Sequence, residues 1–206
     1  MQRFLPSEYG SDVTNDKLNS LIPVFAPKIA VIDYLKSKES EISWTSIITG
    51  AFFDWGLKVS FLGINGQTKT ATLIDGGESK FVTTNLRQIG RAIIKTLEQP
   101  EKTKNQHVYV SSFVTSQKEI LAAAEKTTGE KWTVENVVGQ EKLNNGLEKL
   151  GKHDYSGVVD LLQATVLGNF GVGDFSSKLW NEKLGLEKED FEETVKTGLS
   201  GKLVGE

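Results

Sequence analysis

Residues 3–10 read Arg-Phe-Leu-Pro-Ser-Glu-Tyr-Gly, and this stretch decides the fold. Arg3–Leu5 is a short, largely apolar run, which is typical of a buried strand. Pro6 then stops the strand, and Gly10 permits a turn with positive φ. A strand that ends in this way lies at the rim of an α/β sheet, where ligands commonly bind. Because only two residues precede it, we expect the chain to begin inside a sheet.

The rest of the sequence alternates between strand and helix patterns. Apolar residues at helical spacing and β-branched runs indicate the two classes. The predicted strands are 42–48, 71–74, 107–110 and 132–138, and the predicted helices are 24–38, 85–97, 116–129, 140–150, 155–167 and 187–197. This alternation predicts an α/β fold.

Two helix starts carry the capping-box pattern, in which the first residue and the third after it cap each other. These are Asn85 with Gln88 and Ser116 with Glu119. The helix that begins at Asn85 is expected to bury one stripe of side chains. That stripe consists of Leu86, Ile89, Ile93 and Leu97.

Composition excludes several classes of function. The 206 residues suffice for one large domain or for one and a half ordinary ones, with 38% hydrophobic and 25% charged residues and a net charge of −3. Scattered charges give no reason to expect a nucleic-acid or anionic-membrane partner. The absence of cysteine excludes disulfides, thiolate metal sites and a cysteine nucleophile. No apolar run approaches the roughly 20 residues of a membrane span, so we expect a cytoplasmic protein.

Four short motifs have both a functional and a structural interpretation. Gly171–Gly173 imitates a phosphate loop but lacks the third glycine. Tyr34 and Lys38 have the spacing of a Tyr-x-x-x-Lys catalytic pair, yet they fall at the charged, solvent-facing end of a helix.

The other two motifs contain histidine. His153–Ser156 includes the residue types of a catalytic triad, but sequence neighbours rarely converge as a triad does, which favours a helix start. His107 begins a strand, and with a single further histidine a histidine-based metal site is not expected, so we predict no metal.

Lys28 is the polar residue that stands out. It lies in the first turn of a predicted helix, where Pro27 is well tolerated, and its neighbours Phe25, Ile29 and Ile32 are apolar. A lysine in this position either extends its ammonium to solvent or performs chemistry. The residues alone leave both interpretations open.

Together these residues resemble a known family. The segment "RFLPSEYG", then Phe25-x-x-Lys28, then "WTSIITGAFFDWGL" at 44–57 is similar to the NmrA-like and isoflavone reductase-like group of atypical short-chain dehydrogenases. The likeness continues through 85–97 and ends with 179–199. It therefore spans nearly the whole chain.

The resemblance implies the C-terminal portion of a Rossmann-like, doubly wound parallel sheet plus a smaller, helix-rich substrate-binding part. Residues 1–206 would be a single NmrA-like domain, truncated at its N-terminus. Residues 1–60 and 85–110 would be the remnant of the sheet, and 61–84 and 111–206 the substrate-binding part. The family places three or four βα units before the strand at residues 3–5.

For the site, the resemblance implies that Lys28 is the general base or proton shuttle of an NAD(P)H-dependent reductase. NADP(H) would lie beside six residues. They are Pro6, Ser7, Glu8, Tyr9, Gly50 and Phe52. Plant reductases of this group tend to carry Asn at the position of Gly50. A glycine there lacks the polar contact that the Asn side chain would make at the site.

One departure from the family affects the cofactor. No Gly-x-Gly-x-x-Gly follows a strand, so we predict that this chain alone does not bind NADPH tightly. Two functions stay open: a reductase of a small, possibly aromatic molecule, and an NmrA-like regulator that senses dinucleotide without turnover. An open edge at Arg3–Leu5 also predicts self-association.

Overall fold

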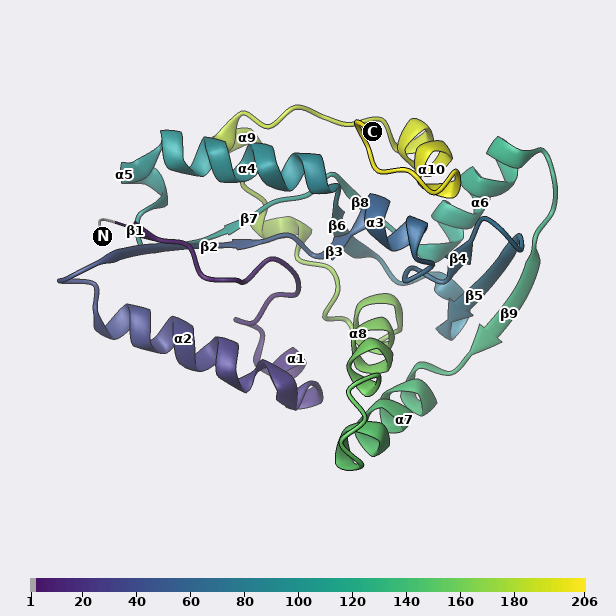
Figure 1. The fold of residues 1–206 in the computed structure, drawn as a ribbon, viewed down its shortest axis with the longest axis horizontal. Helices are drawn as coiled ribbons and strands as arrows, with labels where there is room; N and C mark the ends of the chain where they lie inside the picture. Colours follow the sequence, from purple (N-terminus) through teal and green to yellow (C-terminus); the bar gives the residue numbers. More distant parts are fainter. Residues whose placement is uncertain (1–2) are drawn as a thin grey trace.

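A computed structural model describes residues 3–206 and confirms the α/β class. Strands β1 (Arg3–Phe4), β2 (Ser43–Ile48) and β7 (Gln106–Tyr109) form a parallel sheet in the order β1-β2-β7. Helix α2 (Ala26–Ser37) covers one face and α4 (Leu86–Glu98) covers the other (Figure 1). Since both faces are covered, β2 is a continuous buried run, as central parallel strands are. This arrangement is the doubly wound sheet that the resemblance implies.

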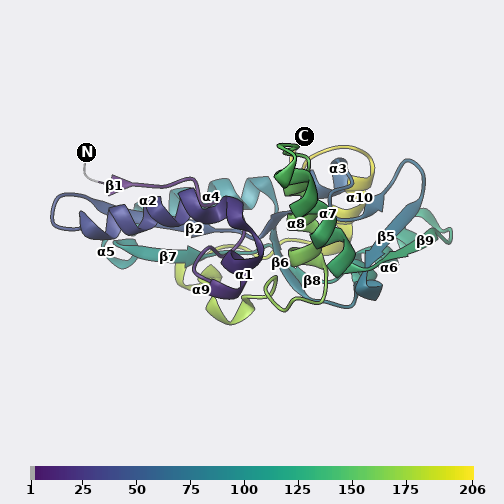
Figure 2. The ribbon, with the colours of Figure 1, turned by 90° about the horizontal axis from the view of Figure 1, so that it is seen from below.

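A second region, with two further sheets, lies at the other end of the elongated molecule (Figure 2). Its strands form the sheets β3-β6-β8 and β4-β5-β9. The strands are β3 (Ala51–Phe52), β4 (Ile64–Asn65), β5 (Thr70–Ile74), β6 (Phe81–Thr84), β8 (Phe113–Thr115) and β9 (Thr133–Val137). The sheet β3-β6-β8 draws strands from both of the predicted parts of the chain, and β4-β5-β9 draws them from the second part alone.

Helices complete both regions. Helices α6 (Gln117–Thr128) and α10 (Phe191–Leu199) pack beside the second region, and α7 (Gly139–Gly151) pairs with α8 (Gly157–Leu167) below it (Figure 1). The remaining elements are α1 (Asp16–Leu21), η1 (Pro23–Phe25), α3 (Phe53–Lys58), η2 (Asp75–Gly77), α5 (Pro100–Thr103), η3 (Ser176–Lys178) and α9 (Asn181–Leu184).

The capping box at Ser116 and Glu119 is confirmed, and the one at Asn85 is wrong. The Asn85 side chain makes no cap bond; instead it donates to Glu189 Oε2 at 3.1 Å. Asp54 Oδ1 accepts from the Leu86 backbone N–H at 3.1 Å and so supplies the cap from a different helix. Tertiary structure has therefore replaced a local cap with a long-range one.

Two further helix predictions need correction. Leu97 is 51% exposed, and α4 buries Ala92 and Thr96 beside Ile89 because its contact face is rotated from the predicted stripe. The last helix begins at Phe191, not at Glu187, since Asp190 caps it by accepting from the Glu193 backbone N–H at 2.9 Å.

Strand β1 lies at the edge of its sheet. It pairs with β2, and among residues 3–206 no strand pairs with its other side. Self-association through this edge stays a prediction, which light scattering over a concentration series can test. Within the same residues, no helix combines the length and the apolar character needed to cross a membrane.

Candidate functional site

The candidate site lies where the parallel strands β1 and β2 end. The loop after β1 turns sharply, with the Glu8 backbone N–H donating to Pro6 O at 2.8 Å. Gly10 O then accepts from the backbone N–H groups of Thr49, at 3.2 Å, and Gly50, at 2.9 Å. These bonds hold the two loops together at the carboxyl edge of the sheet, which is where open α/β sheets bind ligands.

Lys28 reaches this edge from the first turn of α2. Its Nζ donates to the carbonyl oxygen of Ser7 at 2.5 Å and lies 3.7 Å from Glu8 Oε2. The predicted apolar surroundings are therefore incomplete, because a carbonyl and a carboxylate face the ammonium. The side chain of Lys28 is 37% exposed, so solvent reaches part of it at this edge of the sheet.

Glu8 is a buried carboxyl group. It is 2% exposed, and no group among residues 3–206 donates a hydrogen bond to its Oε2. Burial raises the pKa of Glu8 above its ordinary value, and the charge of Lys28 only partly offsets that rise. Ser7, by contrast, is exposed at the tip of the turn.

The other two residues of this loop point elsewhere. Pro6 is buried, and Tyr9 packs against the cluster that includes Ile47 and Ala92, on the face of the sheet that α4 covers. Burial raises the pKa of the Tyr9 hydroxyl. The structure thus brings Lys28, Ser7 and Glu8 together and places Tyr9 on the opposite face.

Gly50 and Phe52 follow β2. Gly50 has φ of +64°, and a Cβ there would lie 2.0 Å from Val82 O, so packing against β6 requires glycine. A side chain at this position would meet backbone rather than project from the edge. Phe52 is half-buried at the end of β3, where it pairs with Thr84.

A second polar cluster lies at the carboxyl end of β7, and the sequence analysis missed it. Asp12 is 2% exposed; its Oδ2 accepts from Lys178 Nζ at 2.8 Å, and its Oδ1 accepts from Thr14 Oγ1 at 2.6 Å and from the Tyr109 hydroxyl at 3.3 Å. Burial raises the pKa of Tyr109, and the bond to Asp12 raises the pKa of Lys178. The signal was available in part, since Asp12 and Tyr109 both follow or end a parallel strand.

His107 lies in β7 beside β2. Its Nδ1 is 2.6 Å from Ser46 Oγ, and its ring meets the edge of Trp44 with centroids 4.9 Å apart. Burial lowers the pKa of His107. Because Ser46 is fully buried, this pair is part of the packing between the sheet and α2.

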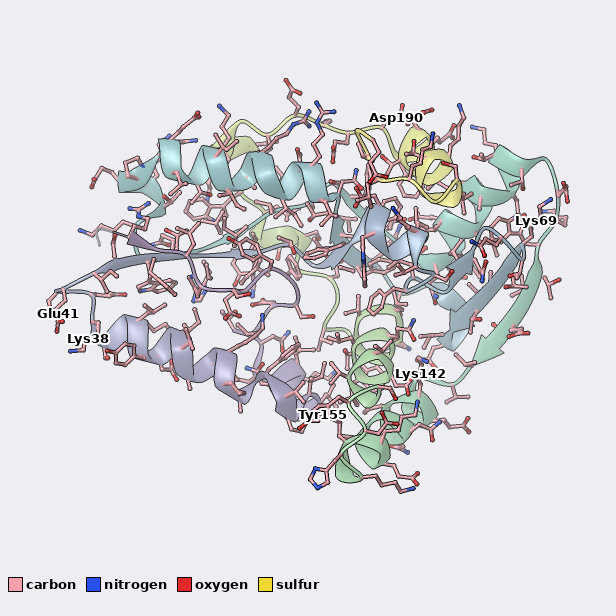
Figure 3. The ribbon with its side chains drawn as sticks, in the orientation of Figure 1. Lys38, Glu41, Lys69, Lys142, Tyr155 and Asp190 are labelled. Carbon is pink, nitrogen blue, oxygen red and sulfur yellow. The ribbon has the colours of Figure 1, made fainter. Side chains whose placement is uncertain are left out.

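The remaining motifs lie away from the site. Tyr34 is 63% exposed, and Lys38 pairs with Glu41 at 2.8 Å at the far end of α2 (Figure 3). Val172 is buried in the core, and Gly173 O accepts from the Val82 backbone N–H at 2.9 Å, so packing accounts for these two residues.

His153–Ser156 forms the turn between α7 and α8. There Asp154 Oδ1 accepts from the Ser156 backbone N–H at 2.9 Å. Across residues 3–206, no three histidine, aspartate or glutamate side chains gather as a metal ion would require.

Comparisons with known proteins agree with this architecture. The model of the NmrA-like family matches residues 1–184. The chain belongs to the NmrA-like family. An oxidoreductase of Aspergillus flavus, aprR, is 30% identical over 204 residues, which cover 97% of this chain and 68% of that protein. The bifunctional pinoresinol-lariciresinol reductase 2 of Linum usitatissimum is 29% identical over 191 residues, which cover 84% of this chain and 54% of that protein.

Solved structures show the same fold. The complex of leucoanthocyanidin reductase with NADPH from Vitis vinifera superposes with a TM-score of 0.76 at 19% identity, over 97% of this chain and 66% of that one. A crystal structure of isoflavone reductase gives a TM-score of 0.71 at 16% identity, over 95% and 65%. The chain thus spans about two thirds of the length of the Aspergillus flavus oxidoreductase and of the two solved structures, and about half the length of the Linum usitatissimum reductase.

Proposed function

We propose that this chain is the substrate-side portion of an NAD(P)H-dependent reductase that acts on a small molecule, an aromatic one being the first candidate. The observation that carries the proposal is the position of Lys28 Nζ, accessible at the carboxyl edge of the sheet. A lysine ammonium has three donors, and the Ser7 carbonyl engages one of them, which leaves donors available to a ligand. The relatives named as oxidoreductases support the same assignment.

The residues of this chain fit the nicotinamide end of a dinucleotide better than its pyrophosphate. A buried carboxylate oxygen without a hydrogen bond and an accessible ammonium at the carboxyl edge are features of a site where a ligand binds. The pyrophosphate end lacks its glycine-rich loop within this chain. Ser7 and Phe52 would lie beside the nicotinamide, which supplies a hydride when bound.

Lys28 then has a defined part in the chemistry. An ammonium at Nζ can give a proton to an oxygen of the substrate, and the amine that results can take a proton back from water. The Ser7 carbonyl holds Nζ in place at 2.5 Å. General acid–base catalysis of this kind contributes about 10²–10⁴-fold to a rate.

The proposal is tested by calorimetry and turnover. The chain alone should bind NADPH more weakly than micromolar, because no pyrophosphate loop is present. The same chain joined behind the first third of the Aspergillus flavus oxidoreductase should bind NADPH and reduce an aromatic carbonyl or benzylic ether. Binding without turnover of any tested substrate would instead favour the regulator that senses dinucleotide.

A further inference from the structure

Glu8 stands out because, in the part of the chain that the structure describes, its carboxyl oxygen Oε2 is buried without a hydrogen bond that would offset the free-energy cost of burying it. It is 2% exposed and its Oε2 accepts no hydrogen bond from residues 3–206. A buried carboxylate without such partners costs free energy, and a neutral side chain of the same size would not carry that cost. The chain nevertheless has a carboxyl group here.

The only charged side chain within residues 3–206 that acts on the pKa of Glu8 is Lys28. Their separation of 3.7 Å is too long for a hydrogen bond but short enough for strong attraction. The Ser7 carbonyl holds Lys28 Nζ from one side at 2.5 Å, and the Glu8 carboxylate faces it at 3.7 Å. What Glu8 adds is negative charge.

We propose that Glu8 is a positioning residue whose buried carboxylate holds the Lys28 ammonium at the carboxyl end of β1. This inference rests on the proposed function, in which the Lys28 ammonium serves the substrate. The buried carboxylate stabilises the ammonium by attraction, and the loss of that carboxylate makes the ammonium easier to deprotonate.

The first test uses this chain of 206 residues without any cofactor. Lysine labelled with ¹³C at Cε is titrated by NMR, and the resonance of Lys28 is identified by its absence in Lys28→Arg. In Glu8→Gln the ammonium of Lys28 loses the attraction of the carboxylate, so it should lose its proton at lower pH than in the unmodified chain. The matched control is Glu41→Gln, which removes the carboxylate partner of Lys38 at the exposed end of the same helix. There the midpoint of Lys38 should move much less.

A second measurement uses a different variant, so it remains informative even if Glu8→Gln folds poorly. In Lys28→Met the ¹³C carboxyl resonance of Glu8 should titrate at higher pH than in the parent chain, because the cation that lowers the pKa of Glu8 is gone. An unchanged Lys28 midpoint in folded Glu8→Gln, or an unchanged Glu8 midpoint in Lys28→Met, would overturn the inference.

Turnover separates this inference from the proposed function. In the joined protein, Glu8→Gln should move the alkaline limb of the pH–rate profile to lower pH, and Glu41→Gln should leave it unchanged. If each of Lys28 and Glu8 affects the titration of the other but the joined protein shows no turnover, the proposed reductase activity is refuted and the positioning role of Glu8 stands. Turnover that depends on Lys28 with an unmoved alkaline limb would refute the positioning role and leave the reductase standing.

Discussion

The two ends of α2 carry the same pair of residue types in different environments. Lys28 and Glu8 lie 3.7 Å apart at its start, and Lys38 and Glu41 lie 2.8 Å apart at its end. Both lysine side chains are 37% exposed. The carboxylates differ, since Glu8 is 2% exposed and Glu41 is 66% exposed.

This comparison shows that separation alone is a poor measure of an ion pair. The shorter pair is solvated, and exposed pairs of that kind contribute about 0–1 kcal/mol. The longer pair includes a buried carboxylate, so a change in either partner alters the free energy of a charge that water does not screen. We therefore expect variants at the start of α2 to have effects that variants at its end do not.

Lys28→Ala should produce the largest effect. In the joined protein it should lower the rate of reduction about 10²–10⁴-fold, because it removes the proposed proton donor, with little change in NADPH affinity. Steady-state kinetics and calorimetry on the same preparation measure the two quantities.

Tyr34→Phe and Lys38→Ala are the controls for that variant. They lie six and ten residues along the helix, which at about 1.5 Å per residue places them roughly 9–15 Å from Lys28. Both should leave the rate nearly intact. A large loss in Tyr34→Phe would identify the ordinary Tyr-x-x-x-Lys mechanism and refute the role of Lys28.

Lys28→Met should destabilise the fold by about 1–2 kcal/mol at pH 7.5. It leaves Glu8 buried without its cation, and partial solvation of the ammonium keeps the loss below that of a fully buried pair. The deficit should shrink at acid pH, where a protonated Glu8 no longer needs a cation. Urea unfolding at pH 7.5 and at acid pH measures this loss of stability. A loss that is the same at both pH values would contradict the explanation.

Glu8→Gln should stabilise the fold at neutral pH by about 1 kcal/mol, or about 2–4 °C in Tm for a chain of this length. Burial raises the pKa of Glu8 above 4.5, so its contribution to stability is present below pH 4.5 and is lost as pH rises through the raised pKa. The advantage of glutamine should therefore be largest at neutral and alkaline pH and vanish in acid. Thermal unfolding that shows a loss of stability at pH 7.5 would assign Glu8 a structural role instead.

Local sequence signals predicted much of this arrangement. Pro6 and Gly10 mark the end of a strand, and Pro27 marks the first turn of a helix, so the loop and Lys28 could both be placed at the carboxyl edge. These signals succeed because they act through the backbone of a few neighbouring residues.

Long-range contacts could not be predicted in the same way. Asp12 and Lys178 are 166 positions apart, and no local pattern joins them. Asp54 caps α4 from a separate helix, which displaced the predicted cap at Asn85. The burial of Glu8 belongs to this class too, because a glutamate two residues after a proline in a loop is exposed in most proteins.

The smallest effect is expected from Glu41→Gln. The pair of Glu41 with Lys38 is exposed on both sides, so removal of its charge should change the free energy of unfolding by less than about 0.5 kcal/mol. Any remaining difference should disappear in 1 M salt, where the screening length is about 3 Å. Urea unfolding of this variant beside Glu8→Gln, at low and high salt, completes the comparison. If the two variants changed stability equally and with the same salt dependence, the burial of the carboxylate would not be what distinguishes the two ends of α2.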